Sequence, residues 1–590
     1  MKVMANKEEM KQKNELLDLF TTRNIYAEVA LSQIPRLLSL MDRKKSSKTY
    51  GSFDRNYWQY KVIDFPGASF QIAILPLAMV YTTEYPNNIY YKHYKIREWA
   101  IAAMEFLSEI QNHDGGFNQD YPYIWSVAGV AFPAYSVSEA YLLLSKELNH
   151  PSKEIIIEML KKAGKWLLNS NDVKVTNQES GAAMALYNIY QITGDDKYRD
   201  GAENKIRRIL KNQSPDGWFY EYGGGDPGYL TLGIDYLAKY YQKTGDKDLL
   251  KSLKKSVDFV SYFIHPNGTM GGEYASRNTE FIIPSGFEIL SEEIPLASAI
   301  ADSNIHALNQ GLTIEPMTFD NIYLCFALHY YFQAYDNFQP RTRNVALPYT
   351  KSLITKYFPY SKYIAIKRER YYMVIGASKG GVLRIYNCTK EKSDLIFSDC
   401  GFIGTLSNGK IVSNQWLDYS NEVTLDEDKN IISISGTFHK LSQVLPSSTK
   451  FIFSRIGLPL ISKIPFARNY LYQQLRKLMI TGSPTIPIEF TRKISYTGEK
   501  ISISDILNFK KNFQFKYFNV DDKFSTIYGQ SKEFFQKQEL SNIKPIPEDN
   551  LAEFITGRCK LSIVREIYPD SKELKYEIKV GNQKISGDLK

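Results

Sequence analysis

A repeat of 51 residues constrains the fold of this chain more than any other feature of its sequence. The segment YQITGD at 190–195 returns as YQKTGD at 241–246, and the Asp-Gly turn at 216–217 returns as Asn-Gly at 267–268. A period of about 50 residues suits two antiparallel helices and the two loops that join them. We therefore expect stacked helical hairpins whose equivalent loops point into the same space.

The pattern of apolar residues predicts helices from about residue 15 to residue 335. Stretches such as 66–85, 96–111 and 153–169 carry apolar residues at spacings of three and four, which is typical of helices with one buried face. They end in turns such as HDGG, SPDG and HPNG, in which glycine tolerates the positive φ of a tight reversal. Short and long loops alternate between these helices, which predicts an (α/α) toroid, that is, an incomplete barrel.

The periodicity changes near residue 340, after a polar segment that contains proline. Short runs that alternate apolar and polar residues follow, for example at 363–370, 430–439 and 574–581, and Gly and Asn turns separate them. Such runs predict an antiparallel β-sandwich. The predicted fold class is multidomain, α then β, with an (α/α) toroid at 1–340, a linker at 341–360 and a β-sandwich domain at 361–590.

The cysteines and the N-terminus narrow the class of protein. The four cysteines contain no CxxC pair, so neither a structural zinc site nor a disulfide framework is expected. No metal site and no cofactor is predicted, although a calcium ion held by carboxylates and carbonyls would leave too weak a pattern to read. The N-terminus mixes charges of both signs where a secretory signal would be apolar, and no run of about 18 apolar residues follows. We expect a cytoplasmic protein without a transmembrane helix.

Positive charge is concentrated in one segment. The net charge of +9 is modest for 590 residues and is explained by a solvated Lys-rich surface, so no nucleic-acid partner is expected. Between Lys450 and Lys477, however, lie six basic and no acidic residues in an apolar stretch, with a helix expected at 467–482. This composition predicts a packed insertion or, alternatively, a peripheral contact of 450–480 with a membrane or an anionic polymer. The oligomeric state is left open.

The register of the repeat gathers polar and aromatic residues on one rim. Subtracting 51 from Tyr229 gives Gln178, so the loops before these two residues are equivalent, and both precede a helix. Helix N-termini favour anions because their N–H groups are unpaired. The catalytic candidates on the rim are Asn177, Tyr229 and Arg277, and the substrate-binding candidates are Asp54, Arg55, Trp58, Tyr60, Gln178, Glu221, Tyr222, Asp226, Glu273 and Asn278.

Three of these residues have simpler structural explanations. Asn177 is placed where an N-cap is expected. Arg277 is close in sequence to Glu273 and Glu280, with which it could form an ion pair. Tyr229 is one of 43 tyrosines, so packing alone could account for it. The coincidence of amide, phenol and guanidinium on equivalent loops favours the functional interpretation.

These groups suit removal of a proton next to a carboxylate. The hydrogen at C5 of a uronic acid is weakly acidic, and an amide or guanidinium that holds the carboxylate stabilises the charge that develops. A phenol near a cation has a lowered pKa and can act as base or acid. Elimination then breaks the C4–O bond, whereas reprotonation from the other face inverts C5.

At this point the sequence resembles the heparinase II/III-like proteins, which are related to polysaccharide lyases with an (α/α) toroid and an antiparallel β-sandwich. The motifs that carry the resemblance are VTNQESGAAMALYNIY at 175–190, DGWFYEYGGGDPGYLTLGIDYLAKYY at 216–241 and GGEYASRNTEF at 271–281. The resemblance implies that Asn177 neutralises the substrate carboxylate and that Tyr229 is the catalytic acid and base. Gln178 stands where many relatives have histidine.

The sequence departs from that family in the β-domain. In the lyases a histidine from the first strands commonly completes the site, whereas 371–387 contains Ser378 and Lys379 but no histidine. Lys379 is a candidate anchor for the substrate carboxylate, and His439 is a candidate substitute for the missing histidine.

The leading hypothesis is an enzyme that cleaves an acidic, uronate-containing polysaccharide by β-elimination. A uronyl C5-epimerase of polysaccharide biosynthesis is the nearest alternative, because it shares the same carbanion. A glycoside hydrolase would need two carboxylates, for which Asp226 and either Glu273 or Glu221 are candidates. A non-catalytic glycan-binding protein is the remaining class.

Overall fold

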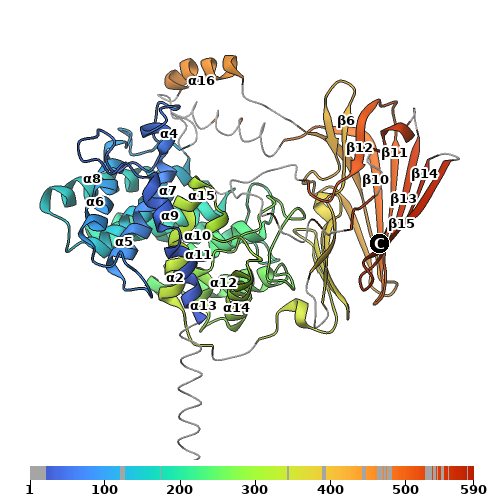
Figure 1. Ribbon diagram of the computed structural model, residues 1–590, viewed down its shortest axis with the longest axis horizontal. Helices are drawn as coiled ribbons and strands as arrows, with labels where there is room; N and C mark the ends of the chain where they lie inside the picture. The colour runs from blue at the N-terminus through green and yellow to red at the C-terminus, as the bar shows by residue number, and fades with distance from the viewer. Residues whose placement is uncertain are drawn as a thin grey trace, which may run out of the picture.

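The computed structural model of the chain has a helical domain followed by two antiparallel β-sheets (Figure 1). This order of domains confirms the predicted fold class. The structure describes residues 22–589 except 120–125, 173, 342–344, 389–393, 442–446, 462–469, 471–473, 475–481, 525–534, 536–539, 541–542, 547–549, 556, 558 and 581–582.

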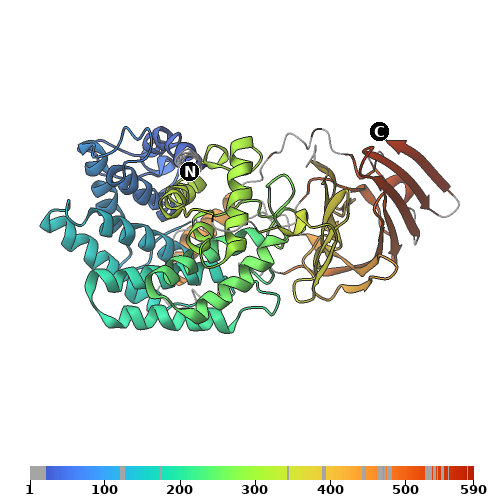
Figure 2. The same ribbon diagram turned by 90° about the horizontal axis from the view of Figure 1, so that it is seen from below.

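The helical domain has an inner and an outer layer (Figure 2). Successive inner helices contact each other, and the last, α15, returns to contact α5, so the inner ring closes. The inner helices are α5 (Ile74–Thr82), α7 (Val127–Leu144), α9 (Thr176–Thr193), α11 (Pro227–Thr244), α13 (Ser285–Leu290) and α15 (Asn321–Asn337). The outer helices are α6 (Tyr94–Glu109), α8 (His150–Leu168), α10 (Asp196–Lys211), α12 (Lys247–Ser261) and α14 (Pro295–Gln310), and α2 (Asn24–Leu31), α3 (Ile34–Leu40) and the short α4 (Arg55–Trp58) precede them.

The 51-residue repeat corresponds to two consecutive helical hairpins, α9–α10 and α11–α12. Both inner helices end on a glycine in the left-handed region, Gly194 at φ 70° and Gly245 at φ 68°, where a side chain would be strained. Asp195 and Asp246 then cap the outer helices by accepting backbone N–H groups. The predicted register is therefore confirmed.

One helix in the described ranges, α7, is long and apolar enough to cross a membrane, but 83% of its apolar window is buried in the interior of the protein. It is packed among the other inner helices, as a core helix of a ring would be.

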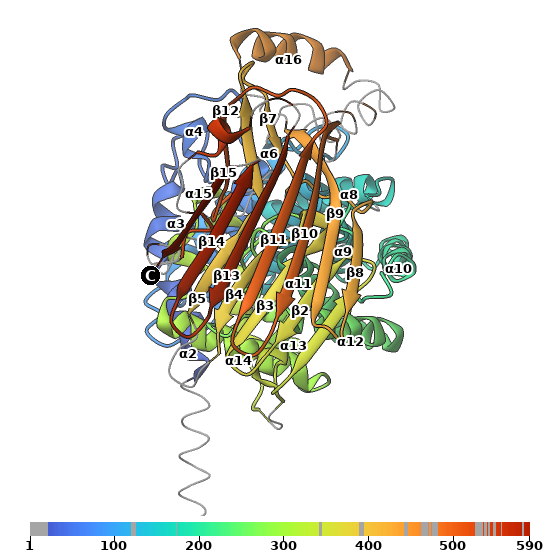
Figure 3. The ribbon, with the colours of Figure 1, turned by 90° about the vertical axis from the view of Figure 1, so that its right-hand side faces the viewer.

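The β-domain has a smaller and a larger sheet, both antiparallel. The smaller sheet has the order β1 (Ile354–Phe358), β2 (Tyr363–Lys367), β3 (Tyr371–Gly376), β4 (Val382–Asn387), β5 (Leu395–Asp399). The larger sheet, seen face on in Figure 3, has the order β12 (Phe515–Val520), β6 (Phe402–Leu406), β7 (Ile411–Ser413), β9 (Ile431–Leu441), β10 (Thr485–Tyr496), β11 (Ile501–Phe509), β13 (Lys560–Tyr568), β14 (Glu573–Val580), β15 (Gln583–Leu589), and β8 (Glu422–Asp426) pairs with β9. Strand β1 starts inside the segment 341–360 that we expected to be a linker.

The smaller sheet is the middle layer of the molecule (Figure 1). In β2, Tyr363 and Ala365 pack into the core of the helical domain, whereas Ile364 and Ile366 pack into the core shared with the larger sheet. Because successive side chains of a strand point to opposite faces, this sheet is covered on both sides, and β2, β3 and β4 are buried at every position. The smaller sheet thus holds the two domains together.

The segment between β9 and β10 reaches back to the helical domain. Its helix α16 (Ser448–Ile461) lies at the outer edge of the molecule, beyond α4, in Figures 1 and 3. Arg455 of α16 forms an ion pair with Asp64 at 2.9 Å and lies over the ring of Phe65, 5.4 Å from its centroid. The helix predicted at 467–482 lies almost wholly outside the described residues.

Candidate functional site

The loops before α9 and α11 pair with each other, as the repeat predicted for equivalent loops. Val175 and Glu221 form an isolated antiparallel bridge. The Thr176 N–H donates to the Tyr220 carbonyl at 3.1 Å, and the Tyr222 N–H donates to the Lys174 carbonyl at 3.0 Å. These contacts fix the start of α9 against the 219–226 loop.

Asn177 binds a buried carboxyl group. Its backbone N–H and its Nδ2 donate to the two carboxyl oxygens of Glu221 at 3.0 and 2.5 Å, and both side chains are buried. Burial raises the pKa of Glu221 well above its usual value, so this group holds its proton to a higher pH than an exposed glutamate. Helix α9 starts at Thr176 with Val175 in the cap position, so the alternative role of Asn177 as an N-cap is wrong.

Gln178 and Arg277 are connected through Tyr222. Gln178 Nε2 donates to the Tyr222 hydroxyl at 3.1 Å, and its Oε1 accepts the Ala128 N–H at 3.3 Å. The Arg277 guanidinium lies over the Tyr222 ring, 4.2 Å from its centroid, in a cation–π contact. Tyr222 and Asn278, the residue after Arg277, both have positive φ, at 55° and 52°.

The Arg277 guanidinium is buried and forms no ion pair within the described part of the chain. The residue is 6% exposed, and its Nε and Nη1 have no hydrogen-bond partner among the described residues. The predicted alternative, an ion pair of Arg277 with Glu273 or Glu280, is wrong, because both carboxylates pair with Arg384 instead. A buried donor without a partner costs about 1–3 kcal/mol, which binding of an anion would offset.

Asp226 connects Arg277 to Tyr229. Its carboxylate caps α11 by accepting the Tyr229 N–H at 3.0 Å, and it also accepts the Arg277 N–H at 2.8 Å and the Thr279 hydroxyl. Burial raises the pKa of Asp226, although these hydrogen bonds oppose the shift. With its acceptor sites used in this way, Asp226 positions the two catalytic candidates relative to each other.

Tyr229 lies half-buried at the edge of an aromatic cluster. Its ring meets Phe281 edge to face at 5.6 Å, and Phe281 in turn contacts Tyr323 at 5.5 Å. Sequence reasoning missed both neighbours, because phenylalanine and tyrosine are common throughout this chain and no local pattern singles them out.

Glu273 and Lys379 lie at the junction of the two domains. Burial alone would raise the pKa of Glu273, but Arg384 (Nε at 2.7 Å) and Lys523 (3.3 Å) lower it to about 2. Lys379 Nζ donates to the carbonyls of Glu273 and Ala275 at 2.7 and 2.9 Å, and burial lowers its pKa to about 8. These contacts anchor the loop that carries Arg277.

Sequence reasoning also missed Arg384, which pairs with Glu273 and with Glu280 at 2.6 Å. A signal was present, since Arg384 is the one charged residue of the apolar strand VLRIYN, in which every position is buried. A lone charge at such a position requires a partner.

Four predicted residues of the 50–67 loop make contacts within that loop or with the helix before it. Asp54 caps α4 and accepts the Gly67 N–H at 3.0 Å. Arg55 donates to Gln59 at 2.6 Å and lies 5.2 Å from the ring centroid of Tyr60. Trp58 Nε1 donates to the Leu40 carbonyl at 2.8 Å. These contacts shape the loop, and the Tyr60 side chain remains 57% exposed.

His439 is held by groups of the β-domain. Its Nε2 lies 3.1 Å from an Asp418 carboxylate oxygen and its Nδ1 lies 3.3 Å from the Ser483 carbonyl. The loop that carries Asp418 packs on the rim beside Gly224. Its neighbours Leu417 and Tyr419 lie so close that a Cβ added to Gly224 would be 2.9 Å from each of their side chains. Among the described residues, no group of three or more His, Cys, Asp or Glu side chains could hold a metal ion.

The helical toroid, the antiparallel β-sandwich and the polar loops on the rim between them make up an architecture of the polysaccharide lyase-like class, as the family match of the helical domain indicates. Residues 70–282 match the family model described as the ulvan lyase N-terminal domain. The match covers about a third of the chain, and it includes the loops that carry Asn177, Tyr229 and Arg277. The resemblance noted in the sequence is thereby confirmed at the level of a polysaccharide lyase-like helical domain.

Several solved structures share parts of this architecture. The chondroitin AC lyase of Streptomyces coelicolor A3, in complex with chondroitin sulphate, is 9% identical with a TM-score of 0.49, over 84% of this chain and 67% of that one. Heparinase III is 10% identical with a TM-score of 0.46, over 93% and 84%. The cellobiose 2-epimerase of Spirochaeta thermophila is 13% identical with a TM-score of 0.39, over 54% and 98%. At these values the likenesses say nothing about reaction or substrate. No curated protein matches the chain.

Proposed function

We propose that this protein cleaves an acidic, uronate-containing polysaccharide by β-elimination at the rim of the helical domain. The observation that carries the proposal is the buried guanidinium of Arg277, which has unpartnered N–H groups and is tied through Asp226 to Tyr229. The match of 70–282 to the ulvan lyase N-terminal domain supports the same reaction class.

Arg277 and Asn177 are suited to hold the substrate carboxylate. A guanidinium binds a carboxylate through two parallel hydrogen bonds, and in a buried site such bonds stabilise the charge that develops as the C5 proton leaves. Asn177 Nδ2 gives one hydrogen to Glu221 and has a second to donate. Because burial raises the pKa of Glu221, this carboxyl group is more readily protonated than an exposed glutamate, which lowers its repulsion of the substrate anion.

Tyr229 is suited to move the proton. As phenolate it takes the proton from C5, the electron pair of that bond forms the C4–C5 double bond, and the C4–O bond breaks. The phenol then returns the proton to the departing oxygen. Phe281 packs edge to face against the ring of Tyr229, which limits movement of that ring between the two steps.

The test is ultraviolet absorbance of the new C4–C5 double bond during incubation with a panel of uronate polysaccharides that includes ulvan. The wild-type protein should give a rise on at least one substrate, and Tyr229→Phe should lower the rate by about 10²–10⁴. The matched control is Tyr220→Phe, a 45% exposed tyrosine of the neighbouring loop, which should keep full activity. A fully active Tyr229→Phe would refute the tyrosine mechanism.

The same incubations separate the alternatives. Deuterium entry at C5 without chain cleavage would identify the C5-epimerase, and new reducing ends without the double bond would identify a hydrolase. For hydrolysis, the candidate carboxylates Asp226 and Glu273 are already engaged, the first by three donors and the second by Arg384 and Lys523. Binding of a polysaccharide without any of these products would identify a non-catalytic glycan-binding protein.

A further inference from the structure

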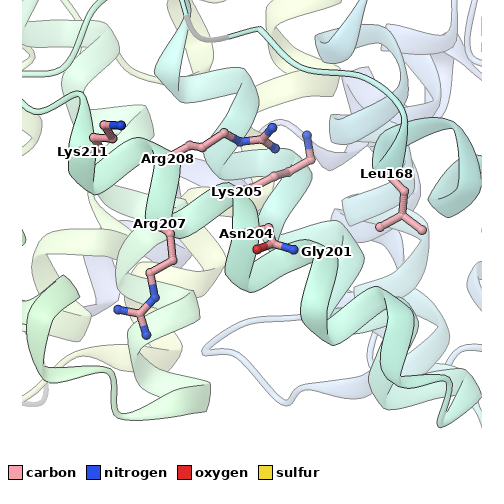
Figure 4. A pocket seen from close by; sticks show the side chains of 7 residues that line it. All are labelled: Leu168, Gly201, Asn204, Lys205, Arg207, Arg208 and Lys211. Atoms are coloured by element: carbon pink, nitrogen blue, oxygen red, sulfur yellow. The ribbon is translucent and has the colours of Figure 1, made fainter.

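A basic cavity of about 460 Å³ opens on the outer wall of the helical domain, beside α10 (Figure 4). It lies between α10 and the end of α8. The residues that line it are Leu168, Gly201, Asn204, Lys205, Arg207, Arg208 and Lys211. Four of these seven residues are cationic and none is acidic.

Two of the four cations are already neutralised. Lys205 pairs with Glu179 at 3.0 Å, and Arg207 pairs with Glu203 at 3.1 Å. Within the described ranges, Arg208 and Lys211 form no ion pair, and Arg208 Nε is a buried donor without a hydrogen-bond partner. Figure 4 shows that Lys205 and Arg208 point to the same side of α10, whereas Arg207 points away from them. The cavity therefore carries uncompensated positive charge.

The cavity lies at the same end of the ring as the candidate site. Helix α10 runs antiparallel to α9, so its last turns lie beside the start of α9. The contact is direct, because Lys205 binds Glu179, which stands two residues after Asn177 in the first turn of α9. The Lys205 ammonium also donates to the Ser170 carbonyl, at 2.7 Å, in the loop that leads into α9.

We infer that this cavity binds a carboxylate or sulfate group of the polysaccharide, on a sugar beyond the one that is cleaved. The inference rests on the proposed function, because the polymer is held at the rim by its own anionic groups. Arg208 presents a planar fork that matches a carboxylate or sulfate, and Lys211 adds a second charge. A long chain that leaves the rim over the loop 169–175 would reach the cavity, whereas a short oligosaccharide in the site would not.

The test compares long and short substrates. For the double variant Arg208→Gln/Lys211→Gln, the KM for the polymer should rise about tenfold, as expected for the loss of two solvent-accessible charge contacts, with kcat unchanged. The KM for a tetrasaccharide should stay at the wild-type value. The matched control Arg199→Gln removes a charge of the same helix that is paired with Asp196 and Asp200 and does not line the cavity, and it should leave both KM values unchanged. The variant Arg208→Lys/Lys211→Gln, which keeps one of the two charges, should show a smaller rise of the KM for the polymer than the double glutamine variant.

The outcomes separate this inference from the proposed function. Wild-type cleavage of the tetrasaccharide tests the function alone, whereas the dependence on chain length tests the cavity. An equal rise of KM for both substrates, or the same rise in Arg199→Gln, would overturn the cavity proposal. Titration with inorganic phosphate adds a further arm. If phosphate bound the wild type but not the double variant, while polymer KM was the same in both, the cavity would serve a free anion instead.

Discussion

Two buried arginines contact or belong to the loop 271–281, and they differ in whether their charge is paired with carboxylates. Arg384 reaches this loop from β4 and is surrounded by the carboxylates of Glu273 and Glu280, so the charges compensate each other. Arg277, on the loop itself, lies over an aromatic ring and has N–H groups without partners in the described part of the chain. Arg384, whose charge is paired with two carboxylates, joins the two domains. Arg277, whose buried N–H donors have no partner, is available to bind an anionic ligand.

The largest effect is expected from breaking the compensated cluster. Arg384→Met leaves two buried carboxylates without their main partner, so the free energy of unfolding should fall by about 3–5 kcal/mol. Urea unfolding followed by circular dichroism measures the loss. The triple variant Arg384→Met/Glu273→Gln/Glu280→Gln is the control, because it removes the stranded charges and should recover much of the stability. A loss below about 1 kcal/mol in the single variant would mean that Arg384 does not hold the domains together.

Replacing Arg277, which forms no ion pair among the described residues, should lower activity more than stability. Arg277→Met should lower kcat/KM by about 10²–10³, because it removes donors that act on developing charge. Its free energy of unfolding should stay within about 1 kcal/mol of the wild-type value, because the lost cation–π contact with Tyr222 is offset by removal of the buried donors without partners. Arg277→Lys keeps the charge without the planar fork, so its activity should remain well below that of the wild type. A destabilised Arg277→Met would place Arg277 among the structural residues instead.

The two glutamates should respond to pH in opposite directions. The pKa of Glu221 is raised above its usual 4.5, so its contribution to stability is present below about pH 4.5 and is lost as the pH rises through the folded-state pKa. The pKa of Glu273 is lowered to about 2, so its contribution is present above about pH 4.5 and is lost as the pH falls toward 2.

Single glutamine variants test this contrast. Relative to the wild type, Glu221→Gln should become more stable as the pH rises, by about 1.4 kcal/mol for each unit of pKa shift, and Glu273→Gln should lose its disadvantage as the pH falls. Urea unfolding of the wild type and both variants across the acidic and neutral range provides the measurement. Parallel pH profiles for the two variants would show that the two carboxyl groups are not in different environments.

The smallest effect concerns α16, whose contact with the helical domain is a surface ion pair. Phe451, Ile452 and Ile456 are 49%, 59% and 66% exposed, and no acidic residue lies near them in the sequence. We propose that this helix contacts anionic lipid, as expected for an apolar helix with basic flanks. Cosedimentation with anionic vesicles should fall severalfold in a triple serine variant, with catalysis unchanged. Equal binding of both proteins, or equal binding to neutral vesicles, would exclude this contact.

The local parts of the fold could be predicted from the sequence. The TGD turns and the 3.6-residue periodicity place α9 to α12, because helix ends and buried faces are determined by residues a few positions apart. The repeat also placed Gln178 and Tyr229 at equivalent helix starts, and the structure brings their loops together. Strands such as β9 and β14 were predicted near their observed bounds, whereas β1 lies inside the segment expected to be a linker because the residues before it are polar and contain proline.

The sequence by itself determined the helical ring, the sandwich and the presence of an amide, a phenol and a guanidinium on one rim. Only the tertiary structure decided which charges are free. The sequence suggests Glu273 as a substrate ligand or as the ion-pair partner of Arg277. In the structure Glu273 pairs with Arg384, 111 residues later, so the Arg277 guanidinium has no carboxylate partner from its own loop. The physical reason is that periodicity and capping act over a few residues, whereas pairing of buried charges depends on the side chains that packing brings together.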